Sequence, residues 1–64
     1  MKGDFTMEVI KMPAEKQARL CEGYAVEFCN WVYHKSSVTG RVYRWTVDAW
    51  LKNGYQEGEE VKIV

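Results

Sequence analysis

The chain has 64 residues, of which 47% are hydrophobic and 28% charged, and its nine basic residues balance nine acidic ones. These values are typical of one small folded domain, which we expect over residues 1–64, and they exclude a multidomain enzyme or a dinucleotide-binding βαβ pair. No apolar run approaches the ~18 residues of a membrane span, and the N-terminal residues lack the apolar stretch of a secretion signal, so we expect a cytoplasmic protein.

The first predicted element is a strand over residues 4–12. Phe5, Met7 and Val9 alternate with polar residues, which is the period of a half-buried strand. Pro13 ends the strand because it has no amide hydrogen, and its fixed φ suits the first position of a helix.

A long amphipathic helix is predicted from Pro13 to about His34. Apolar residues recur at helical spacing from Ala14 to Val32, and Gly23 falls on the polar side, where it costs about 1 kcal/mol relative to alanine. An alternative stays open, in which the helix ends near Glu22 and a hairpin runs from Tyr24 to Val47, because glycine often ends helices.

The rest of the chain favours strands and turns. Residues 35–40 have the composition of a turn, and in residues 41–47 apolar and polar side chains alternate as in a strand. A polar turn is predicted at 56–60, followed by a closing strand at 61–64. Residues 48–54 are either a helical turn or a hairpin about Asn53-Gly54. The predicted fold is α+β, in the order β-α-β-β, with one long helix packed on a small, mostly antiparallel, three-stranded sheet.

The sequence carries no recognisable catalytic or metal motif. Cys21, Cys29 and His34 lack the spacing of metal ligands, and the predicted helix turns His34 away from both thiols. We therefore expect a non-enzymatic protein without cofactor or metal, with both cysteines reduced and buried as small apolar groups.

Aromatic side chains are more numerous than a small core can hide, with three Trp, four Tyr and two Phe. Segment 28–47 also holds Lys35, Arg41 and Arg44 and no acid. Aromatic and basic residues together are typical of protein-binding hot spots and of single-stranded nucleic-acid sites. The candidate contact residues are Tyr33, Arg41, Tyr43, Arg44, Val26 and Lys35, with Trp45 supporting them from the core.

Val26 and Tyr33 are candidates because they fall on the charged side of the predicted helix. With zero net charge, the chain has little long-range attraction for a polyanion. The preferred hypothesis is a protein-binding module that occupies a surface of a larger protein as an inhibitor or regulator, of the kind phages and mobile elements encode. Single-stranded nucleic-acid binding through residues 31–45 and self-assembly into a homo-oligomer are the alternatives.

Overall fold

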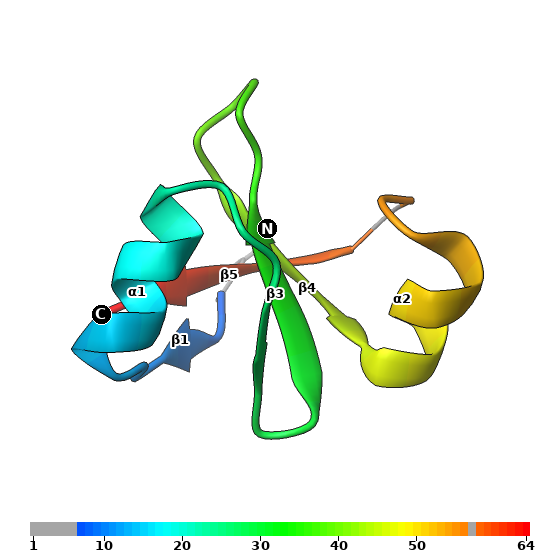
Figure 1. Cartoon of the computed structure of the whole chain (residues 1–64), viewed down its shortest axis with the longest axis horizontal. Helices are drawn as coiled ribbons and strands as arrows, with labels where there is room; N and C mark the ends of the chain where they lie inside the picture. Colours follow the sequence, from blue (N-terminus) through cyan, green and yellow to red (C-terminus); the bar gives the residue numbers. More distant parts are fainter. Residues whose placement is uncertain (1–6, 57) are drawn as a thin grey trace, which may run out of the picture.

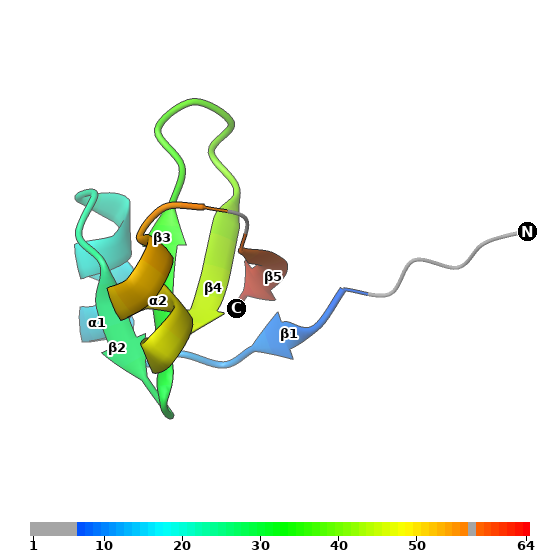
Figure 2. The ribbon, with the colours of Figure 1, turned by 90° about the vertical axis from the view of Figure 1, so that its right-hand side faces the viewer.

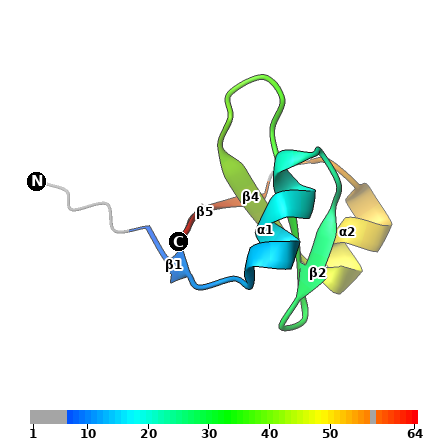
Figure 3. The ribbon, with the colours of Figure 1, turned by 60° about the vertical axis from the view of Figure 1, so that its left-hand side comes forward.

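The computed structural model describes residues 7–56 and 58–64. Within these residues the chain forms two helices and a five-stranded mixed sheet of order β1-β5-β4-β3-β2. The elements are β1 (Val9–Ile10), α1 (Ala14–Cys21), β2 (Val26–Phe28), β3 (Trp31–Lys35), β4 (Val42–Thr46), α2 (Val47–Asn53) and β5 (Glu59–Ile63). Strand β1 is parallel to β5, and the other pairs are antiparallel. The sheet is curled, with α1 on one side and α2 on the other (Figures 1 and 3).

The prediction of one long helix on a three-stranded antiparallel sheet is wrong. Helix α1 stops at Cys21 because Gly23 adopts a φ of 99°. The amide of Gly23 then bonds the carbonyl of Leu20, and the amide of Tyr24 bonds that of Arg19. These two bonds form a glycine cap that satisfies the last carbonyls of the helix. The structure therefore follows the open alternative, in which the helix ends near Glu22.

Residues 26–35 form a hairpin that the sequence analysis did not foresee. Its two-residue turn is Cys29–Asn30, and both residues have positive φ, 51° and 67°. This is the geometry of a tight hairpin turn that usually contains glycine. Strand β3 then pairs with β4 across the predicted turn at 35–40, from Trp31 opposite Thr46 to Lys35 opposite Val42.

The remaining elements partly match the predictions. Strand β1 covers only Val9–Ile10 of the predicted strand at 4–12, of which residues 4–6, including Phe5, lie outside the described part of the chain. Of the predicted residues 48–54, the first six belong to α2 and Gly54 is its C-cap; the Thr46 side chain caps the start of α2 by accepting a hydrogen bond from the amide of Ala49. The predicted polar turn at 56–60 leads into β5 at Glu59; its residue 57 is outside the described residues.

The main core lies between the sheet and α1. Met12, Leu20, Val26, Tyr33 and Val61 are buried there, and Tyr33 is only 1% exposed. The Gln17 side chain closes this side by donating to the carbonyls of Met12 and Val64, both at 2.7 Å. The expectation of buried thiols is wrong, because Cys21 and Cys29 are both free and exposed. Cys21 is the last residue of α1, and Cys29 lies in the turn of the β2–β3 hairpin.

Replacing Gly23 with alanine tests the end of α1. At a φ of 99° a side chain is strained, so we expect Gly23→Ala to lower the free energy of unfolding by about 1–2 kcal/mol in urea denaturation. A continuous helix through this position would give the opposite sign, a gain of about 1 kcal/mol. A stabilised variant would therefore contradict the observed fold.

Candidate functional site

The predicted contact residues divide between the two faces of the sheet. In β4, Arg44 lies opposite Tyr33 of β3, which in turn lies opposite Val26 of β2. These three side chains share the face that α1 covers, and all three are buried. The expectation that Val26 and Tyr33 lie on an exposed stripe is therefore wrong, because they belong to strands and not to a long helix. Tyr43, whose side chain points to the other face, is half-buried.

Arg44 is a buried charge held by neighbouring strands. The residue is 8% exposed. Its Nη2 donates to Glu8 at 3.0 Å, just before β1, and its Nε donates to Glu59 of β5 at 3.2 Å. The guanidinium carbon lies 4.0 Å from the centroid of the Trp31 ring. Burial alone would lower the pKa of Arg44, but hydrogen bonds to Tyr33 and Glu59 and the charges of Glu59 and Glu8 raise it.

The three bases of the central segment do not form a common surface. Arg44 is neutralised inside the molecule by two carboxylates. Arg41 is exposed and lies 3.8 Å from a carboxylate oxygen of Glu60. Lys35 is half-buried and lies near Leu20 and Gly23 at the end of α1. The structure therefore separates Arg41, Arg44 and Lys35, which the sequence analysis had grouped.

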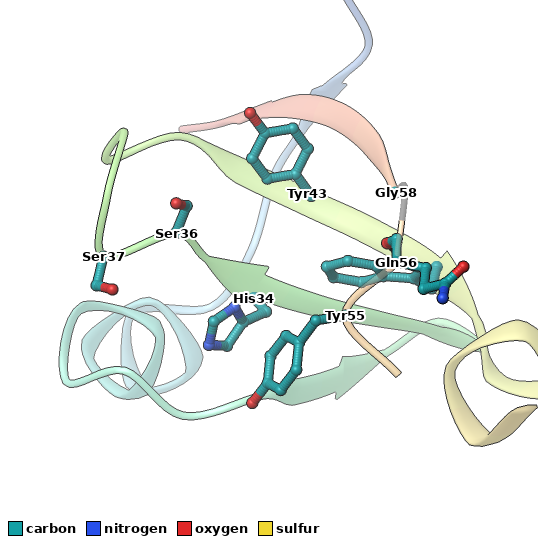
Figure 4. A pocket seen from close by; sticks show the side chains of 8 residues that line it. His34, Ser36, Ser37, Tyr43, Tyr55, Gln56 and Gly58 are labelled. Carbon is teal, nitrogen blue, oxygen red and sulfur yellow. The ribbon is translucent and has the colours of Figure 1, made fainter. Parts of the chain in front are cut away.

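A groove of about 620 Å³ lies on the opposite face of the sheet, beside α2. Tyr43 stands on one side of it and His34 and Tyr55 on the other, with Ser36 and Ser37 at one end (Figure 4). We call it the aromatic groove; its lining residues are His34, Ser36, Ser37, Tyr43, Trp45, Tyr55, Gln56 and Gly58. These eight described residues are aromatic or polar, and none of them carries a carboxylate, an ammonium or a guanidinium group.

Strands β3 and β4 and the segment after α2 bring the rings together. His34 lies opposite Tyr43 in the β3–β4 ladder, and α2 turns the chain back so that Tyr55 reaches His34. The centroid distances are 4.9 Å for His34–Tyr55, 5.0 Å for Trp50–Tyr55 and 5.1 Å for Trp45–Trp50. The first two pairs pack edge to face, a favourable geometry for aromatic rings. Figure 2 shows α2 lying beside β3 and β4.

Trp45 is fixed in place as part of this lining. Its indole Nε1 donates to the carbonyl of Gln56 at 2.7 Å. Gly58 lies so close to the indole that a Cβ there would be 2.6 Å from Cε2 of Trp45. Gln56 and Gly58 therefore both lie against the Trp45 ring and hold its orientation.

The aromatic groove includes residues that the sequence analysis did not select. Tyr43 is the one predicted contact residue in its lining, and Trp45 was expected to support the contact surface. The alternation that places Tyr43 and Trp45 on one face of β4 is visible in the sequence. His34 joins them because it lies opposite Tyr43 in the β3–β4 pairing. Tyr55 and Gln56 carry no such signal, because only the path of the chain after α2 brings them to the sheet.

Two further features of the described residues are the grouping of metal-ligating side chains and the length of the helices. Over 7–56 and 58–64, no group of three or more His, Cys, Asp and Glu side chains is placed to hold a metal ion. Neither helix in this part of the chain has the length and apolar character needed to cross a bilayer.

Comparison with known proteins gives no further guide. No protein-family model, curated protein or solved structure matches the chain.

The Arg44 ion pairs predict non-additive effects on stability. Glu8→Gln and Glu59→Gln should each lower the free energy of unfolding by less than about 1 kcal/mol, because each carboxylate is more than half exposed and the other still faces Arg44. The double variant should lose about 3 kcal/mol, since it leaves a buried guanidinium without a counter-charge. Urea denaturation of the four proteins measures the coupling, and strict additivity would contradict this account.

Proposed function

We propose that the chain is a non-enzymatic protein-binding module that holds an extended segment of a larger protein in the aromatic groove. The observation that carries this proposal is the lining itself, in which four aromatic side chains, His34, Tyr43, Trp45 and Tyr55, surround an open volume of about 620 Å³. Tyr and Trp are the side chains most enriched where proteins gain binding energy, because each provides a large rigid surface with a polar end.

The packing of the rings supports a recognition role. His34, Trp50 and Tyr55 contact one another, and the Trp45 indole is held by the carbonyl of Gln56. A surface that is ordered before binding loses little side-chain entropy when a partner arrives. Tyr55 nevertheless remains 69% exposed, so much of its ring surface stays available in the groove.

The positions of the basic side chains favour a protein partner over a single-stranded nucleic acid. A nucleic-acid groove combines stacking rings with several cations that follow the phosphates. Here the lining rings have no cation among them, Arg44 faces two carboxylates on the opposite side of the sheet, and Arg41 is paired with Glu60.

The β2 edge of the sheet does not favour self-assembly by strand pairing. Strand β2 is one of the two edge strands, the other being β1; it has three residues, and the main chain of Glu27 faces away from β3. The Lys16 ammonium donates to the Glu27 carbonyl at 3.2 Å and so covers a main-chain acceptor there. Short edge strands and lysine side chains are common protections against edge-to-edge pairing.

Selection from a displayed library of random peptides tests the proposed function. We expect peptides to be enriched on the wild-type chain, and Tyr55→Ala to weaken their binding by about tenfold or more, because truncation removes an exposed ring of the groove. Tyr24→Ala is the matched control: Tyr24 is also exposed, at 53%, but lies beside Arg19 of α1.

Binding measured by isothermal calorimetry should change less than about twofold in Tyr24→Ala. Circular dichroism should show the same fold in both variants, since both side chains are exposed. The proposed function is refuted if the library yields no ligand, or if its ligands bind Tyr55→Ala as well as they bind the wild type.

A further inference from the structure

We propose that Asn53 is a modification site, at which the Asn53-Gly54 pair converts without an enzyme to aspartate and isoaspartate through a cyclic imide. The site lies in the segment between α2 and Tyr55, and its chemistry does not depend on the ligand proposed for the aromatic groove. Three features of this segment support it: the residue that follows Asn53, the exposure of Asn53, and the weak hold on the last turn of α2.

The reaction needs only the side-chain amide of Asn53, the main-chain nitrogen of Gly54 and water. The Gly54 nitrogen loses its proton to solvent and attacks Cγ of Asn53. The N–Cγ bond forms, the Cγ–Nδ2 bond breaks, and Nδ2 leaves as ammonia after taking a proton from solvent. Water then opens one of the two C–N bonds that close the imide ring. Opening at Cγ gives aspartate, and opening at the main-chain carbonyl gives isoaspartate, so neither an oxidant nor a cofactor is needed.

The chain has two asparagines, and they differ in the residue that follows. Asn53 precedes Gly54, which has no Cβ to crowd its nitrogen. Among the described residues other than its chain neighbours, nothing lies within 4 Å of the point where a Cβ would stand at Gly54, so the attack has open space around it. Asn30 is also exposed, but it is followed by the bulky Trp31, which β2 and β4 hold in β3. Asn30 is therefore a matched control within the same chain.

The last turn of α2 is held weakly. Asn53 is exposed and is the final residue of this seven-residue helix, none of whose residues is buried. The Gly54 N–H donates to the Trp50 carbonyl at 2.9 Å, and this bond must open before the nitrogen can lose its proton and turn toward Cγ. Helix ends open locally at low free energy, and the net contribution of one such bond corresponds to about fivefold in an equilibrium. The fold therefore slows the reaction and does not prevent it.

Conversion changes the chain just before Tyr55. Isoaspartate carries the main chain through its Cβ and Cγ, which lengthens the link between α2 and Gly54 by one carbon atom. Both products also place a carboxylate at the C-terminal end of α2, where the helix dipole disfavours a negative charge. Tyr55 packs against Trp50 at 5.0 Å and against His34 at 4.9 Å between ring centroids. We therefore expect the isoaspartate form to lose this packing at the groove.

Incubation of the folded wild-type chain in mildly alkaline buffer, followed by digestion and mass spectrometry of the peptides, tests the site. Replacement of an amide by a carboxylate changes the peptide mass, and electron-transfer fragmentation distinguishes isoaspartate from aspartate. We expect Asn53 to convert at least about tenfold faster than Asn30. Unfolding in urea should accelerate the reaction at Asn53 by about fivefold. Equal rates at the two asparagines, or an Asn53 that converts only in urea, would overturn the proposal.

Thr46→Ala tests the control of the reaction by α2. The Thr46 side chain caps the start of this short helix, so its truncation should make the helix open more often. We expect Asn53 to convert about fivefold faster in this variant, with the rate at Asn30 unchanged. An unchanged rate at Asn53 would overturn the assigned role of α2.

Asn53→Gln is the control for the site and for its effect on the groove. Glutamine keeps the amide but cannot close a five-membered imide, so this variant should keep its mass under the same conditions. Nuclear Overhauser contacts between the Trp50 and Tyr55 rings should be present in Asn53→Gln and in fresh wild type, and absent from the purified isoaspartate form. Their retention in that form would overturn the expected effect on the groove. None of these measurements uses a ligand, so their failure is distinct from failure of the proposed function.

Discussion

The sheet is covered on both faces, and this constraint determines the placement of β4. Consecutive residues of a strand point to opposite faces, so Arg44 lies on the α1 side of the sheet and Trp45 on the α2 side, and both are buried. A buried guanidinium is stable only with partners, and Arg44 has Glu8, Glu59 and the Trp31 ring. These contacts tie β4 to β5, to the residue before β1 and to β3, and they hold the register that places Tyr43 and Trp45 on the opposite face.

The two faces of the sheet therefore have different roles. The α1 face contains the buried apolar cluster and the compensated charge, and it contributes to stability. The α2 face holds a row of rings that pack loosely enough to leave a groove between Tyr43 and Tyr55. The short helix α2 matters because, capped by Thr46, it returns the chain to the sheet at Tyr55. Without that return, His34, Tyr43 and Trp45 would form a flat aromatic surface and not a groove.

Several elements could be predicted because their signals are local. Pro13 marks the start of α1, Asn53-Gly54 marks the end of α2, and the alternation of Tyr43 and Trp45 marks β4. The hairpin at Cys29–Asn30 could not, since its turn lacks glycine and the apolar residues before it happen to recur at helical spacing. The predicted alternation in β4 matches the structure. Arg44, however, is predicted from the sequence to be a contact residue, whereas in the structure it is buried. Sequence alone does not show that α1, Glu8 and Glu59 cover its face of the sheet.

The three tryptophans allow the central claim, that the α2 face and not the α1 face recognises the ligand, to be tested in a single titration. The indole N–H signals of Trp31, Trp45 and Trp50 can be followed in a ¹⁵N-labelled chain as a peptide selected from the displayed library is added. Trp45 and Trp50 pack around the groove, whereas Trp31 lies beneath Arg44 on the other face. The account predicts that the signals of Trp45 and Trp50 shift together while that of Trp31 stays. A shift of Trp31 with Trp45 and Trp50 unchanged would contradict it.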